Sequence, residues 1–146
     1  MKAPFVIGRM IFGGYFIHAG INHFIHTNQL TQYAGAKSIP QPDLAVKASG
    51  VALIAGGASI LLGVKPKYGA LALVGFLAAV SPAMHRFWED EDPGERMHDM
   101  VDFAKNLALA GGALALAGVE EPWPASLGKT SAAKRLGKTA WRILAA

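Results

Sequence analysis

The amino-acid sequence predicts an all-α integral membrane protein: an antiparallel four-helix bundle, followed by a basic amphipathic helix at the membrane interface. The 146 residues are 52% hydrophobic and only 16% charged. The charges are also segregated, because Asp, Glu, Lys and Arg are absent from residues 10–36, 48–64, 68–85 and 106–119. A soluble amphipathic helix places a charge on its outer face every few residues. Helices that are apolar around their whole circumference suit lipid, and a soluble bundle would lack helices to cover these four segments.

The first helix is predicted over residues 4–26. Its uncharged run exceeds the roughly 20 residues that cross the hydrocarbon core of a bilayer. Lys2 before an apolar run resembles a signal peptide, but Arg9 interrupts the run and no Ala-x-Ala cleavage site follows. We therefore interpret this segment as a retained membrane helix. Residues 27–43 are polar and contain two prolines, which predicts a loop over the mouth of the bundle.

Three further helices are predicted over residues 44–64, 68–88 and 97–118. Their uncharged runs are shorter, so flanking Lys and Arg side chains must extend their charges to the lipid headgroups. The short turn at residues 65–67 makes the second and third helices antiparallel neighbours. The fourth helix spans the membrane only if residues 97–105 continue it outward. The acidic run 89–95 lacks the ligand order of a calcium loop and is predicted to be a solvated loop.

The basic residues predict how the bundle is oriented. Because cytoplasmic loops carry an excess of Lys and Arg, the richer side is assigned to the cytoplasm. Nine basic residues fall on that side: Lys2, Arg9, Lys65, Lys67, Lys129, Lys134, Arg135, Lys138 and Arg142. Five fall on the other: Lys37, Lys47, Arg86, Arg96 and Lys105. We predict a multi-pass protein of the cell (inner) membrane, with the N and C termini in the cytoplasm.

The chain divides into a helical domain, residues 1–119, and a basic tail, residues 120–146. Within the tail Lys134, Lys138 and Arg142 lie four residues apart on one stripe, and Trp141 lies near its boundary. This pattern is typical of a helix that lies on anionic lipid. The alternative is a frayed tail that only supplies the topology signal. Since topology explains the net charge of +4, nucleic-acid binding is not predicted.

Polar side chains gather at the extracytoplasmic end of the predicted bundle. At about 1.5 Å of rise per residue, the end of the first helix, the end of the third and the start of the fourth reach the same level. Polar residues within membrane spans are candidates for function. The candidate ligand-binding residues are His18, Asn22, Ser81, His85, Trp88 and Asn106. His98 and Asp102 are spaced one helical turn apart, which predicts an Asp-oriented imidazole and a proton relay.

These imidazoles can exchange protons with the outside or hydrogen-bond the carbonyls of a quinone, with Phe87, Trp88 or Phe103 packed on its ring. The alternative is that histidine and tryptophan anchor helix ends at the interface. Haem ligated by His18 and His85 stays open as a less favoured cofactor. No metal site is predicted: the histidines lack zinc-protease spacing, and a chain with 0 cysteines has no thiolate ligands.

The chain resembles the DoxX family of small four-helix membrane proteins over about residues 9–118. The resemblance rests on Arg9, Phe12-Gly13-Gly14, Leu61-Leu62-Gly63, His85-Arg86-Phe87-Trp88 and the run from Lys105 to Gly112. It implies the four-helix topology and an association with membrane redox chemistry, since named relatives are subunits of quinol- or thiosulfate–quinone oxidoreductases. Only His85 and Asn106 match family motifs among the candidate site residues.

The leading hypothesis is a subunit or accessory of a membrane oxidoreductase, with a quinone-type ligand at the extracytoplasmic end. It implies the lipid bilayer and a protein of the same membrane complex as partners. A non-catalytic scaffold that recruits a partner is the second hypothesis, and a carrier of a small solute or lipid is the third. The sequence leaves open whether the chain forms a homo-oligomer and whether it is itself catalytic.

Overall fold

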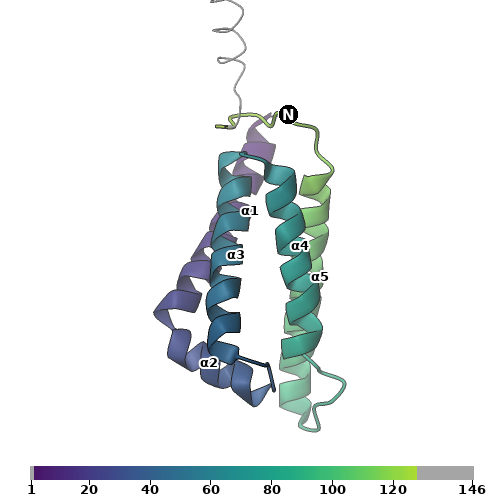
Figure 1. Ribbon diagram of the computed structural model, residues 1–146. Coiled ribbons are helices and arrows are strands. Elements are labelled where there is room, and N and C mark those ends of the chain that lie inside the picture. Colours follow the sequence, from purple (N-terminus) through teal and green to yellow (C-terminus); the bar gives the residue numbers. More distant parts are fainter. Residues whose placement is uncertain (1, 128–146) are drawn as a thin grey trace, which may run out of the picture.

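A computed structural model describes residues 2–127, and that range contains five α-helices: α1 (Lys2–Ile25), α2 (Thr27–Ala36), α3 (Pro42–Leu62), α4 (Pro66–Met84) and α5 (Pro93–Ala117). The four long helices, α1, α3, α4 and α5, are each long and apolar enough to cross a membrane. They run side by side, and both ends of the described chain lie at one end of the bundle (Figure 1). The predicted all-α class with four spans is confirmed. Lys134, Lys138, Trp141 and Arg142, the predicted lipid-surface residues, lie outside the described residues.

The bundle is buried on the inside and apolar on the outside. Phe16, Ile60 and Leu73 are at most 1% exposed and form its centre. Large apolar side chains on the outer face, such as Ile11 and Leu107, are more than 60% exposed. An apolar surface of this kind along four long helices is that of a protein embedded in a bilayer.

Helices α1 and α3 form the closest pair because glycines line their contact. A Cβ atom placed on Gly57 would lie 2.6 Å from the carbonyl oxygen of Gly13, and one on Gly20 would lie 2.7 Å from that of Gly50. Small residues let two backbones approach in lipid, where packing replaces the hydrophobic effect as the attraction between helices. α4 packs against both α3 and α5.

One helix was not predicted, and another begins earlier than the apolar pattern predicts. α2 occupies most of the segment expected to be a loop and lies across the bundle at the end opposite the N-terminus (Figure 1). Its first seven residues contain no Gly or Pro, so nothing breaks the helix until the turn before Pro42. α5 begins at Pro93 because the Asp92 side chain accepts a hydrogen bond from the Glu95 N–H at 2.9 Å and Pro suits the first helical turn.

α4 ends at Met84, four residues before the predicted end. Pro82 lacks the N–H of a helical residue, and the Ser81 hydroxyl donates to the Leu77 carbonyl at 2.6 Å. His85 then leaves helical geometry, with φ −121° and ψ 63°. The chain therefore turns at His85 toward α5.

The segment after α5 folds back over the N-terminal end of the bundle. Trp123 is 3% exposed and packs edge-on against Phe5 with ring centroids 5.2 Å apart. The buried Arg9 donates from Nη2 to the carbonyl oxygen of Ala125 at 2.5 Å, and the Leu127 N–H donates to the carbonyl oxygen of Leu62 at 2.9 Å. Residues 120–127, the first part of the predicted tail, thus pack on the helical domain.

Candidate functional site

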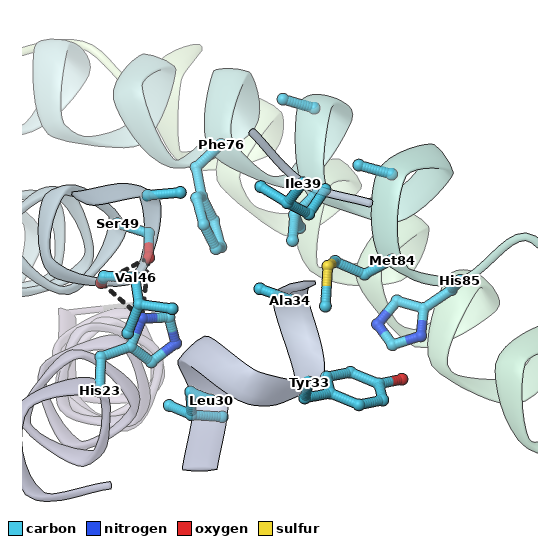
Figure 2. A pocket seen from close by; sticks show the side chains of 14 residues that line it. His23, Leu30, Tyr33, Ala34, Ile39, Val46, Ser49, Phe76, Met84 and His85 are labelled. Atoms are coloured by element: carbon cyan, nitrogen blue, oxygen red, sulfur yellow. Dashed lines mark hydrogen bonds between the residues drawn. The ribbon is translucent and has the colours of Figure 1, made fainter. Parts of the chain in front are cut away.

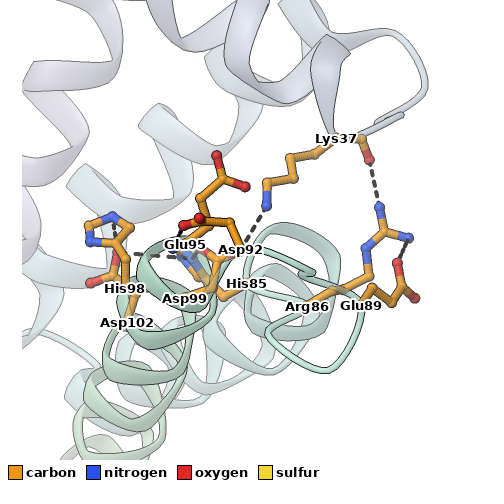
Figure 3. A network of polar contacts seen from close by, with 9 residues as sticks. All are labelled: Lys37, His85, Arg86, Glu89, Asp92, Glu95, His98, Asp99 and Asp102. Atoms are coloured by element: carbon orange, nitrogen blue, oxygen red, sulfur yellow. Dashed lines mark hydrogen bonds and ion pairs between the residues drawn. The ribbon is translucent and has the colours of Figure 1, made fainter.

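Three polar side chains from separate elements meet at the α2 end of the bundle, the end opposite the N-terminus. Asp99 on α5 is 3% exposed and accepts hydrogen bonds from two groups. Lys37, which follows α2, donates from Nζ to Asp99 Oδ2 at 2.8 Å. His85, which follows α4, approaches Asp99 Oδ1 with Nδ1 at 3.2 Å (Figure 3). One buried carboxylate therefore connects α2, α4 and α5.

A second carboxylate, Asp102, lies one turn along α5. The predicted i, i+4 pair is present, with His98 Nε2 3.5 Å from Asp102 Oδ2. Lys105 Nζ lies 2.5 Å from the other oxygen of Asp102, and His85 Nδ1 lies 3.9 Å away. The His98 side chain is 74% exposed, whereas that of His85 is 16% exposed. The imidazoles and carboxylates therefore form a series from the interior to the surface.

Arg86 links the end of α2 to the connection between α4 and α5 through a hydrogen bond and an ion pair. Its Nη2 donates to the carbonyl oxygen of Lys37 at 3.2 Å, and its Nη1 lies 3.3 Å from Glu89 Oε2 (Figure 3). Lys37 is thus held through both its side chain and its backbone, which fixes the end of α2 against α4 and α5.

The hydrogen bond to Asp99 raises the pKa of Lys37, an effect that outweighs the opposing effect of burial. Burial likewise raises the pKa of the Tyr33 phenol, against the opposing charge of Lys37. Both groups lie outside the membrane-spanning segments. Lys37 therefore stays charged, and Tyr33 stays neutral, throughout the physiological pH range.

We predict the pH dependence of the Lys37 contribution to stability from this shift. Because the folded-state pKa of Lys37 is raised, its contribution is fully present below the ordinary lysine value of about 10.4 and is lost as pH rises through the folded value. Lys37→Gln should therefore lower the unfolding free energy by a constant amount between pH 6 and pH 9. Thermal unfolding in detergent at several pH values, against the exposed control Lys47→Gln, checks this. A difference that disappears below pH 9 would contradict it.

An apolar pocket of about 360 Å³ lies beside this cluster, between α3 and α4 and beneath α2. Most of the lining is aliphatic or aromatic. His85 and Tyr33 lie at one side of the pocket, and His23 and Ser49 lie at the other (Figure 2). The full lining is His23, Leu30, Tyr33, Ala34, Ile39, Ala45, Val46, Ser49, Phe76, Ala79, Val80, Ala83, Met84 and His85.

His23 is fixed by α3. Its Nδ1 lies 2.8 Å from Ser49 Oγ and 3.2 Å from the carbonyl oxygen of Val46. The Ser49 hydroxyl in turn donates to the same Val46 carbonyl at 2.8 Å. The ring of His23 is therefore held in one orientation, with its other nitrogen toward the pocket (Figure 2).

A polar hollow of about 570 Å³ adjoins the apolar pocket at Tyr33. Its lining includes Lys37, Glu95, His98 and Asp99, and Tyr33 lines both spaces. Since His85 lines the apolar pocket and bonds to Asp99, which lines the hollow, one hydrogen bond joins the two. This arrangement can pass a proton between an apolar site and a polar, open one.

The structure separates the predicted ligand-binding residues. His85 lines the pocket, whereas the other five lie elsewhere. His18 is exposed on α1, Asn22 is half-buried there, and Asn106 is buried on α5. Ser81 is buried and bonds within α4. Trp88 is 53% exposed and packs against Phe87 and Phe103, with centroids 5.1 and 5.9 Å apart.

Sequence reasoning missed Asp99, Lys37, His23, Tyr33 and Ser49 as site residues. Asp99 carried a usable signal, because a carboxylate in the first turns of a membrane helix needs a partner. Lys37 and Tyr33 belong to the segment that was expected to be a loop. His23 lies next to Asn22 near the end of the first predicted helix, but the sequence gives no sign that it, rather than His18, faces the pocket.

Four apolar spans around a pocket with buried polar groups define a multi-pass helical membrane protein. The DoxX family model matches residues 5–86, which is more than half of the chain and covers α1 to α4. The chain therefore belongs to the DoxX family. Comparisons with curated proteins and with solved structures found no match.

Proposed function

We propose that this protein is a subunit or accessory of a membrane oxidoreductase and that it binds a quinone-type ligand in the apolar pocket at the α2 end. The observation that carries the proposal is that this pocket ends on His85, an imidazole held by a buried carboxylate. A quinone is largely apolar with a polar oxygen at each side of its ring. It needs this combination of an apolar cavity and a few fixed polar groups.

The residues present fit such a ligand. A volume of about 360 Å³ falls within the usual range for small-molecule sites. Phe76 and Tyr33 offer rings to pack on a planar ligand, and His85 Nε2 can accept a hydrogen bond from a hydroxyl of the reduced ligand. When bound, a quinone supplies two-electron chemistry that is coupled to proton uptake and release. Asp99 orients the His85 ring and accepts its Nδ1–H, and His98 and Asp102 carry protons to the surface.

The proposed orientation places the α2 end on the extracytoplasmic side of the inner membrane. It follows from the nine-to-five distribution of basic residues, with both termini in the cytoplasm and the tail on anionic lipid. Protons would then exchange with the outside through the polar hollow. A redox enzyme of the same membrane is the proposed partner, since the chain itself carries no motif for a second cofactor.

Anaerobic titration of the protein in mild detergent with duroquinone, a tail-less benzoquinone, and with its reduced form, duroquinol, tests the proposal. We expect saturable binding of the probes, and we expect His85→Leu to weaken the binding of duroquinol by about tenfold, since the hydrogen bond from its hydroxyl to His85 is lost. His85→Leu should still fold, because Asp99 keeps its ion pair with Lys37. His26→Leu is the matched control, as His26 is exposed and does not line the pocket.

Two outcomes would contradict the proposal. Absence of binding, together with capture of a membrane protein in stoichiometric amount, would favour the scaffold hypothesis. Uptake of a solute or lipid into vesicles that depends on His85, without quinone binding, would favour a carrier.

A further inference from the structure

We propose that the pocket selects the reduced form of its ligand, an aromatic ring with two hydroxyl groups, over the oxidised form with two carbonyls. The inference rests on the proposed function and goes beyond it, because it assigns the redox form. It follows from the hydrogen bonds that His23 and His85 already make within the protein through Nδ1, which leave Nε2 of each ring for the ligand.

At one side of the pocket, His85 faces Asp99 through Nδ1. A carboxylate only accepts hydrogen bonds, so Nδ1 carries the proton. In a neutral imidazole the remaining nitrogen, Nε2, is then an acceptor with a free lone pair. His85 therefore presents an acceptor to the pocket.

At the other side, His23 faces Ser49 Oγ and the Val46 carbonyl through Nδ1. The carbonyl only accepts, and the Ser49 hydroxyl proton is already donated to the same carbonyl. The Nδ1 atom of His23 must therefore be the donor in both contacts. Its Nε2 is a second acceptor, on the pocket side of the ring (Figure 2).

The other polar groups of the lining do not reverse this preference. The Ser49 hydroxyl already donates its proton to the Val46 carbonyl and has none left for a ligand. The Tyr33 hydroxyl can donate or accept, so it serves a hydroxyl and a carbonyl equally well. The side chains at the two sides of an apolar cavity thus provide two fixed acceptors. A bound hydroxyl donates to such an acceptor, whereas a carbonyl oxygen would face it with both groups unpaired.

The consequence is a measurable difference in affinity. An unpaired buried acceptor costs enough to weaken binding about tenfold or more. We therefore expect duroquinol to bind at least tenfold more tightly than duroquinone. A tenfold preference for the reduced form raises the midpoint potential of the bound two-electron couple by about 30 mV.

The experiment compares three probes by anaerobic equilibrium dialysis at pH 8, where imidazoles are ordinarily neutral. The probes are duroquinone, duroquinol and the dimethyl ether of duroquinol, which has no hydroxyl to donate. We expect duroquinol to bind most tightly and the ether to bind no better than duroquinone. His23→Gln and His85→Gln add an N–H donor at either side, so each should bring the affinity ratio toward one.

His26→Gln is the matched control and should keep the ratio of the unaltered protein. Binding of duroquinone that equals or exceeds that of duroquinol would overturn this inference and leave the proposed function intact. Binding of none of the three probes would overturn both. A ratio that the two pocket variants leave unchanged would show that the preference has another origin and would also overturn the assignment.

Discussion

Asp99→Ala is expected to lower the free energy of unfolding by about 2–3 kcal/mol and to weaken the binding of duroquinol. The carboxylate is 3% exposed and holds two cationic or donor groups from other elements. Breaking a buried pair costs about 3–5 kcal/mol when its partner stays buried. We expect less because the Lys37 side chain is 24% exposed and can turn to water. Denaturation in mild detergent measures the first effect, and anaerobic titration of the folded variant with duroquinol measures the second.

The chain offers a matched control for this change. Asp43 pairs with Lys47 at the same 2.8 Å, but their side chains are 59% and 51% exposed. Exposed pairs contribute about 1 kcal/mol or less, so Asp43→Ala should change stability little and leave binding unaltered. Asp99→Asn, which keeps an acceptor oxygen, should lie between the two. Equal stability losses for Asp99→Ala and Asp43→Ala would contradict the role of Asp99 as the link between α2, α4 and α5.

Trp123→Ala is expected to destabilise the protein by about 3–5 kcal/mol, the range for deleting a buried tryptophan. Trp123 is 3% exposed, packs on Phe5 and donates from Nε1 to the Val119 carbonyl at 3.3 Å. It also lies 6.0 Å from the Arg9 guanidinium. Its loss removes the aromatic contact that helps to hold the segment after α5 against α1. Thermal unfolding and limited proteolysis at residues 118–127 measure the effect.

Trp88→Ala provides the comparison, since Trp88 is 53% exposed and contacts only Phe87 and Phe103 among the aromatic rings of the described chain. It should cost about 1 kcal/mol and leave proteolysis after α5 unchanged. Trp123→Phe should recover most of the stability, because the ring is kept and one hydrogen bond is lost. If Trp123→Ala is as stable as Trp88→Ala, the segment after α5 is not anchored by this residue.

The membrane spans could be predicted from the sequence because the residues of a helix embedded in lipid are almost all uncharged and apolar. The stretches without charge mark α1, α3, α4 and the second half of α5. The ends of the helices could not be predicted in the same way, because other groups set them. Asp92 and Pro93 extend α5 through a polar first turn that hydropathy does not register, and α4 ends just after Pro82, where His85 leaves helical geometry.

The site was only partly predictable for a related reason. The level of the polar cluster follows from helix length, so the sequence could predict that His85, His98 and Asp102 lie together at one end of the bundle. Which face of each helix points inward depends on packing between helices. The glycines of α1 and α3 set that rotation, and it brings His23 to the pocket while His18 faces outward. Lys37 reaches Asp99 only because α2 folds across the bundle.

The most direct test of the central claim is mass spectrometry, with an optical spectrum, of the protein purified gently from its native membrane. The account predicts a co-purifying quinone in the unaltered protein and in His26→Leu, with much less of it in His85→Leu. A colourless protein without quinone in any of the three, accompanied by another membrane protein in stoichiometric amount, would contradict the proposed ligand and indicate a scaffold.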